Sequence, residues 1–143
     1  MALKKEVDFI IIAGDLFDNE NRTLRAEVFL KEQFERLRKE QVFVYVCHGN
    51  HDPLSSKISS NWPNNVSVFS NQVETYQAIT KDGETIFIHG FSYQNDTSYE
   101  NKIDAYPSSQ GQKGIHIGVL HGTYSKSSVK DRYTEFRLED LNS

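Results

Sequence analysis

Two short motifs place candidate metal ligands directly after apolar runs. They are Gly14–Asp18 (GDLFD) and Gly49–Asp52 (GNHD). Carboxylate, amide oxygen and imidazole groups are the ligands of hydrolytic sites that hold manganese or zinc. The ends of strands in open α/β sheets are also where ligands and catalytic groups collect. The two motifs therefore predict a metal-dependent hydrolytic site at one edge of a sheet.

Each residue of these motifs has a specific and a simpler interpretation. Asp15 could bridge two metal ions, or it could cap a helix or form a turn. Asn50 could offer its amide oxygen to a cation, or it could form a turn after glycine. His51 could protonate a leaving alkoxide, or it could be a polar surface residue. Asp52 is the second candidate catalytic residue because it could orient His51 through a hydrogen bond, or it could cap the following loop.

Histidines supply the third element of the predicted site. His121 follows the last apolar run and precedes a glycine, so its ring is a candidate third ligand. His48 and His89 also end apolar runs, which weakens the argument for any single histidine. His116 alternates with isoleucines, which favours a structural role. The joint placement of Asp, Asn-His and His at three strand ends is more specific than any of these residues alone.

The first half of the chain has the pattern of a βαβ unit. Val7–Ala13 and Val42–Cys47 are apolar runs typical of strands buried in a parallel sheet. Asn19–Lys39 has helical spacing, and Asp18 or Asn19 is the expected N-cap. The apolar residues expected on its buried face are Leu24, Val28, Leu30, Phe34 and Leu37.

The second half is expected to contain short strands and long polar loops. Asp82-Gly83 predicts a hairpin turn. Asn95–Gly114 is expected to be mostly loop, with a possible short helix over Glu100–Ala105, and Pro53–Asn65 is also expected to be loop. The predicted strands are Val66–Phe69, Val73–Ile79, Thr85–His89 and Ile115–Leu120.

Composition limits the class of protein. The chain has 143 residues with a formal net charge of −4, and it lacks a membrane-length apolar run. Cys47 is the only cysteine, so an intrachain disulfide is impossible and a cytoplasmic location is expected. A strand begins directly after Met1–Glu6, and Phe136–Leu141 has the pattern of a helix start. We therefore expect residues 1–143 to be a single, truncated domain.

The motifs resemble those of the calcineurin-like metallophosphoesterases. GDLFD, GNHD and VLHG (residues 119–122) are similar to successive motifs of that family, and residues 7–53 are especially similar to its DNA-repair exonuclease (SbcD-type) branch. The resemblance extends over essentially the whole chain. It implies an α/β fold in which two sheets are sandwiched between helical layers (α/β/β/α).

The resemblance also implies a role for each matching residue. Asp15 matches the carboxylate that bridges two Mn²⁺ ions, and Asn50 and His121 match ligands of one of them. His51 matches the histidine that contacts the phosphate and assists the leaving group. Two metals would activate water and stabilise an in-line displacement. Positions that match supporting residues of the motifs are Asp18, Asp52 and Gly122.

The sequence departs from the family pattern in two places. The family begins with an Asp-x-His motif and ends with a Gly-His-x-His motif, and neither occurs in these residues. Those motifs supply the remaining metal ligands, most of them for the second metal. We therefore expect the inferred function to belong to a longer parent protein and the fragment to be impaired.

The expected function is metal-dependent phosphodiester hydrolysis on DNA, as a repair exonuclease. The alternatives are hydrolysis of small nucleotides or phosphoproteins, and a non-catalytic, metal-poor scaffold of the same fold. The expected partners are DNA, a coiled-coil ATPase subunit and a second copy of the chain, without a membrane. Candidate DNA contacts are Arg22, Arg25, Lys126, Lys130 and Arg132.

Overall fold

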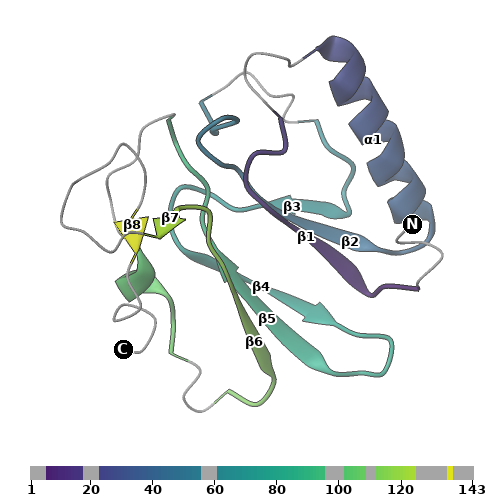
Figure 1. Ribbon diagram of the computed structural model, residues 1–143. Coiled ribbons are helices and arrows are strands. Elements are labelled where there is room, and N and C mark those ends of the chain that lie inside the picture. The colour runs from purple at the N-terminus through teal and green to yellow at the C-terminus, as the bar shows by residue number, and fades with distance from the viewer. Residues whose placement is uncertain are drawn as a thin grey trace.

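Two small β-sheets face each other, and one α-helix covers the outer side of the first sheet (Figure 1). The computed structural model describes residues 6–17, 23–55, 61–95, 102–108, 112–124 and 135–136. The described layers are therefore helix, sheet and sheet, which agrees with the expected α/β class. The second helical layer implied by the family resemblance is not among the described elements.

The first sheet confirms the predicted βαβ unit. It contains β1 (Phe9–Ala13), β2 (Phe43–Cys47) and β3 (Val66–Val68), all parallel and in that order. Phe9 pairs with Phe43 and Ala13 pairs with Cys47, so the two strands end at the same level. The apolar runs of β1 and β2 form strands because β-branched and aromatic side chains pack well on a pleated surface.

The second sheet combines a hairpin with a parallel strand. β4 (Glu74–Ile79) and β5 (Thr85–Gly90) are antiparallel, and β6 (Ile115–Val119) lies parallel to β5. The turn between β4 and β5 contains Gly83 at φ +85°, a conformation that glycine adopts without steric cost. The predicted Asp82-Gly83 hairpin is therefore confirmed.

Two short strands and one short helix lie outside these sheets. β7 (Thr123–Tyr124) pairs with β8 (Glu135–Phe136), so Phe136 belongs to a strand and the expected helix does not begin there. The remainder of that expected helix, residues 137–141, lies outside the described part of the chain. The short helix expected over 100–105 is a 3₁₀ turn, η2 (Ile103–Ala105).

Helix α1 (Leu24–Lys39) begins five residues later than the sequence predicted. Thr23 has an extended backbone (φ −114°, ψ 150°), and its side chain accepts a hydrogen bond from the Ala26 N–H at 3.2 Å. The N-cap is therefore Thr23 and not Asp18 or Asn19, because an extended residue cannot lie inside a continuous helix. The helix has 16 residues, and no helix of the described chain is long and apolar enough to cross a bilayer.

Two apolar clusters stabilise the layers. Between the sheets lie Tyr45, Cys47, Phe69, Ile88 and Val119, among others. Between α1 and the first sheet, Phe34 and Leu37 pack against strand residues such as Val44 and Val46. These contacts fix the ends of β1, β2 and β6 relative to one another.

The first half of α1 does not follow the expected burial. Leu24 is 78% exposed and Val28 is 50% exposed, whereas Phe34 and Leu37 are buried. The reason is angular: at about 100° per residue, Val28 lies roughly 120° around the helix from Phe34 and Leu24 roughly 140° from Leu37, so both point away from the sheet-facing side. The prediction of one continuous buried face is therefore wrong for the first turns.

A chain of hydrogen bonds orders two histidines of the second sheet. His116 Nε2 lies 3.4 Å from the Gln112 carbonyl oxygen, and His116 Nδ1 lies 3.0 Å from His89 Nε2. His89 Nδ1 lies 2.8 Å from the Thr75 hydroxyl. A carbonyl oxygen can only accept, so His116 donates to Gln112, His89 donates to His116, and Thr75 donates to His89. These directions apply when both rings are neutral. Because the Thr75 hydroxyl can also accept, the chain tolerates one protonated ring, and the His89–His116 hydrogen bond is lost when both rings are protonated.

This arrangement predicts a loss of stability in mild acid. Burial, and secondarily the charge of His116, lower the pKa of the His89 imidazole from its ordinary 6.5. As the pH falls through 6.5, the unfolded chain takes up a proton at this position before the folded chain does, so the free energy of unfolding decreases. The slope from this one group is at most about 1.4 kcal/mol per pH unit.

Urea unfolding of the wild type and His89→Gln between pH 5.5 and 7.5 measures how the free energy of unfolding depends on pH. The variant should show a shallower decline, and an equal decline in both proteins would contradict the prediction.

Candidate metal centre

The loops that follow β1 and β2 emerge side by side from the first sheet. The Gly14 N–H donates to the Cys47 carbonyl at 2.9 Å, which extends the strand pairing by one residue. Gly14 and Asp15 then both adopt positive φ, +81° and +49°. A non-glycine residue in this region is uncommon, and such residues cluster at functional sites. This turn brings the Asp15 carboxylate to the loop that carries Asn50 and His51.

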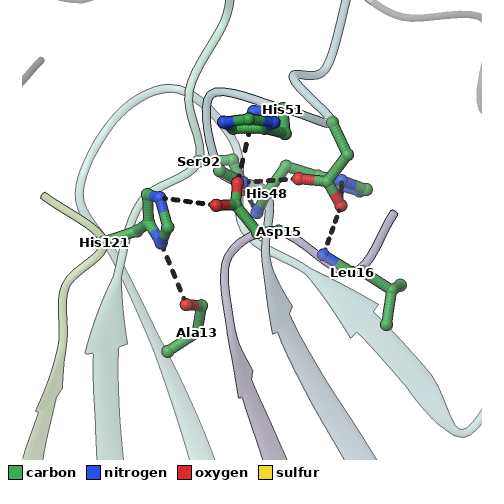
Figure 2. A network of polar contacts seen from close by, with 9 residues as sticks. Ala13, Asp15, Leu16, His48, His51, Ser92 and His121 are labelled. Atoms are coloured by element: carbon green, nitrogen blue, oxygen red, sulfur yellow. Dashed lines mark hydrogen bonds and ion pairs between the residues drawn. The ribbon is translucent and has the colours of Figure 1, made fainter. Parts of the chain in front are cut away.

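Three predicted ligands converge above the strand ends. His121 Nε2 lies 3.0 Å from Asn50 Oδ1 and 3.5 Å from Asp15 Oδ2. Figure 2 shows His121 beside Asp15, with the His51 ring above the same carboxylate. The Asp15 side chain is 40% exposed and that of His121 is 23% exposed, so solvent reaches the cluster. The structure thus brings together Asp15, Asn50 and His121 from three separate loops.

The hydrogen bonding of His121 leaves a lone pair in this cluster. His121 Nδ1 lies 3.1 Å from the Ala13 carbonyl oxygen, which can only accept, so Nδ1 carries the proton (Figure 2). In the neutral ring, Nε2 then presents a lone pair toward the oxygens of Asn50 and Asp15. Metal-binding histidines commonly donate their other ring nitrogen to a carbonyl in this way. A divalent cation satisfies three converging electron-pair donors, as does a second ring proton that Nε2 shares with these oxygens.

The spacing and chemistry of the donors fit a divalent ion. Ligands that share an ion through bonds of about 2.1 Å are separated by about 3.0–3.4 Å. The two separations from His121 Nε2 are 3.0 and 3.5 Å. Within the described residues, no group of three or more His, Cys, Asp and Glu side chains gathers, because the third donor is the amide of Asn50. A mixed nitrogen and oxygen set of this kind suits manganese or zinc.

Gly14 and Gly49 permit this close approach. A Cβ atom at Gly14 would lie 2.1 Å from His121 Nδ1. A Cβ atom at Gly49 would lie 2.3 Å from Asp15 Oδ1 and 2.6 Å from the Asp15 backbone nitrogen. Any side chain at either position would therefore separate the ligands.

The two predicted catalytic residues occupy different environments. His51 is exposed at the rim of the cluster, and its backbone N–H donates to Asp15 Oδ1 at 3.2 Å. Asp52 is only 1% exposed. Its carboxylate accepts from the Leu16 N–H at 2.9 Å and from the Gly49 N–H at 2.8 Å. The expected hydrogen bond from Asp52 to His51 stays a prediction.

Two residues that the sequence did not single out, Ser92 and Tyr93, support the cluster together with His48. Ser92 Oγ accepts from the His48 N–H at 2.9 Å, and the His48 ring lies 3.4 Å from Asp52. Tyr93 packs edge-to-face against His121, with ring centroids 5.7 Å apart. Ser92 and Tyr93 lie two and three residues after Gly90, the last residue of β5, so their position near a strand end was the one signal that could have identified them.

Other predicted residues lie apart from the cluster or outside the described chain. Arg25 is exposed on α1, and Gly122 is exposed beside His121. Cys47 is buried and free, and burial raises the pKa of its thiol to about 12, so the thiol is unreactive. The residues that fall outside the described part are Asp18, Arg22, Lys126, Lys130 and Arg132.

Comparison with known proteins gives one family and two relatives. A sequence model of the calcineurin-like phosphoesterase family matches residues 1–142. An uncharacterized metallophosphoesterase of Bacillus subtilis, YhaO, is 46% identical over 142 residues, which are 98% of this chain and 35% of that protein. The DNA double-strand break repair protein Mre11 of Archaeoglobus fulgidus is 42% identical over 62 residues, which are 41% of this chain and 13% of that protein. The chain thus spans about a third of YhaO.

The close packing at Gly49 gives a direct test of the cluster. In Gly49→Ala the new Cβ forces Asp15 away from His121, so the affinity for Mn²⁺ should fall steeply while the apolar clusters stay intact. Gly118→Ala is the matched control, because a Cβ there meets its nearest neighbour, Tyr106, at an ordinary 3.7 Å. Isothermal titration with MnCl₂ measures both variants. Wild-type affinity in Gly49→Ala would contradict the assigned geometry.

Proposed function

Because the chain belongs to the calcineurin-like phosphoesterase family, we propose that it carries part of a metal-dependent phosphodiesterase that acts on DNA. The observation that carries the proposal is the convergence of His121 Nε2, Asn50 Oδ1 and an Asp15 carboxylate oxygen. An ion held there would supply Lewis-acid polarisation of a phosphoryl oxygen and a water of lowered pKa. We propose Mn²⁺ as the ion, in keeping with the mixed donor set.

Different residues of the chain are proposed to bind the ion, to donate a proton and to orient a ligand. Asp15, Asn50 and His121 would hold the ion, and we propose that His51, exposed beside them, contacts the bound phosphodiester. In this proposal His51 donates a proton to the leaving alkoxide, as a general acid. The Ala13 carbonyl keeps the His121 proton on Nδ1, so Nε2 stays available as a ligand.

The similarity to Mre11 supports DNA as the substrate. The matched relative is named as a DNA double-strand break repair protein, and the matching segment covers 41% of this chain. The net charge of −4 means that DNA would be bound by a local basic surface and not by the protein as a whole. Arg25, exposed on α1, is the one proposed DNA contact within the described residues.

Protein partners and location are also proposed. Leu24, Val28 and Phe29 are exposed apolar residues of α1, and such surfaces commonly mark a protein interface. A second copy of the chain and a coiled-coil ATPase subunit are the partners that we propose for the whole protein. A single, unpaired cysteine supports a reducing, cytoplasmic environment.

Substitutions at the cluster test the proposed activity. In the complete protein, Asn50→Ala removes a proposed ligand and should abolish Mn²⁺-dependent cleavage of DNA, and His51→Ala should slow it by about 10²- to 10⁴-fold. Asn64→Ala is the matched control, because Asn64 is exposed in the turn before β3, at the opposite edge of the first sheet. Release of nucleotides from a labelled duplex measures all three. Full activity in both cluster variants would contradict the proposal.

The choice of substrate separates DNA cleavage from hydrolysis of small phosphoesters. The wild type should turn over a duplex faster than a small phosphodiester, and its DNA binding should weaken steeply with salt as phosphate contacts are lost. Faster turnover of the small substrate, without salt dependence, would support the alternative phosphohydrolase. If the protein bound no Mn²⁺, this would support the third alternative, a non-catalytic, metal-poor scaffold of the same fold.

A further inference from the structure

The buried carboxylate of Asp52 joins the two ligand-bearing loops. Its Oδ2 accepts from the Leu16 N–H at 2.9 Å, and its Oδ1 accepts from the Gly49 N–H at 2.8 Å. Leu16 belongs to the loop after β1 and Gly49 belongs to the loop after β2. Asp52 is 1% exposed, so water does not compete effectively for these bonds. Each carboxylate oxygen therefore holds a different loop.

The two amides held by Asp52 are adjacent to ligands. Leu16 directly follows Asp15, and Gly49 directly precedes Asn50. Asp15 has φ +49°, a conformation that persists only when its surroundings hold it. The bond from Leu16 therefore fixes the peptide that sets the direction of the Asp15 carboxylate.

A second carboxylate–amide hydrogen bond joins the same two loops, with the acceptor in the loop after β1 and the donor in the loop after β2. Asp15 Oδ1, in the first loop, accepts from the His51 N–H, in the second loop, at 3.2 Å. Because an ion at the cluster would share the Asp15 carboxylate, this bond alone cannot fix the loops in every state. The Asp52 carboxylate is buried, and its two bonds go to backbone N–H groups and involve none of the three proposed ligand atoms.

The Asp52 network also reaches the third ligand. The His48 ring lies 3.4 Å from Asp52 Oδ2. Both backbone groups of His48, its N–H and its carbonyl, form hydrogen bonds with the segment after β5. Its N–H donates to Ser92 Oγ, and its carbonyl accepts from the Tyr93 N–H at 3.0 Å. Tyr93 packs edge-to-face on His121. A continuous set of contacts thus connects Asp52 to the ligands on all three loops.

We propose that Asp52 is a positioning residue that sets the metal affinity of the site by holding the loops after β1 and β2 in register. It acts through the Leu16 and Gly49 amides and does not itself contact the ion or the substrate. This inference rests on the proposed function, since it assumes that Asp15, Asn50 and His121 bind a divalent ion. Supporting residues of metal sites commonly change affinity by about 10- to 100-fold when they are replaced.

Asp52→Asn tests this role with a minimal change of shape. An asparagine has one acceptor oxygen, so its NH₂ group would face one of the two backbone N–H donors and release that loop. We expect the Mn²⁺ affinity of Asp52→Asn, measured by titration with detection of free Mn²⁺ by electron paramagnetic resonance, to fall about 10- to 100-fold. Asp8→Asn is the matched control, because Asp8 Oδ1 also accepts a backbone N–H, from Lys81 at 2.7 Å, away from the cluster. Asp8→Asn should bind Mn²⁺ like the wild type.

A second measurement separates positioning from catalysis. Excess Mn²⁺ should restore the turnover of Asp52→Asn toward the wild-type value if Asp52 only positions the ligands. A low turnover at saturating Mn²⁺ would overturn the proposal in favour of a catalytic role. Circular dichroism and the melting temperature of the apo proteins control for folding. If Asp52→Asn does not fold, Ser92→Ala, which removes the acceptor of the His48 N–H, should lower Mn²⁺ affinity in the same direction.

The outcomes distinguish this inference from the proposed function. Wild-type affinity in a folded Asp52→Asn or, where that variant does not fold, in Ser92→Ala would overturn the positioning role and leave the metal site intact. A wild-type protein that binds no Mn²⁺ would overturn the proposed function and the positioning role together. An equal loss of affinity in Asp8→Asn and Asp52→Asn would also overturn the inference, because the effect would then be general destabilisation.

Discussion

The in-register, parallel pairing of β1 and β2 is the interaction on which the rest of the site depends. Ala13 pairs with Cys47, and the Gly14 N–H continues the ladder by donating to the Cys47 carbonyl. The two ligand-bearing loops therefore start at the same level of the sheet. A shift of one residue would move Asp15 along the strand by about 3.3 Å and turn it to the other face, which would separate it from Asn50.

The cluster combines tight backbone packing with exposed donor atoms. Gly14 and Gly49 let His121 and Asp15 approach to distances that no other residue would permit. The Ala13 carbonyl fixes the proton of the His121 ring, and the buried Asp52 fixes the loops. The donor atoms themselves remain partly open to solvent. This division between a rigid, buried support and an accessible face is what a site needs in order to bind both an ion and a phosphodiester.

The sequence predicted the strands and the convergence of Asp15, Asn50 and His121 better than the supporting contacts. The apolar runs before Gly14 and Gly49 identified β1 and β2, and the strand ends identified Asp15, Asn50 and His121. The start of α1 was wrong because several residues before the helix are good N-caps, and the extended conformation of Thr23 decided between them. The exposure of Leu24 was missed because the expected face was too wide: at about 100° per residue, Leu24 lies roughly 140° around the helix from the buried Leu37.

The roles of Ala13 and Asp52 could not be predicted for a different physical reason. Ala13 acts through its own backbone carbonyl, and the Asp52 side chain binds two backbone amides. Because almost every residue type carries these backbone groups, the sequence does not indicate which of them take part. The motif indicated that Asp52 mattered, but two interpretations were open. Its 1% exposure and its bonds to both loops favour a supporting role.

The most direct test of the central claim is the location of the ion itself. Crystals grown with MnCl₂ would be measured near the manganese absorption edge, and an anomalous difference map would be calculated. The account predicts a peak at roughly 2.0–2.4 Å from His121 Nε2, Asn50 Oδ1 and an Asp15 carboxylate oxygen. A map without a peak at these three atoms, or with its main peak at another position such as His89 and His116, would contradict the account.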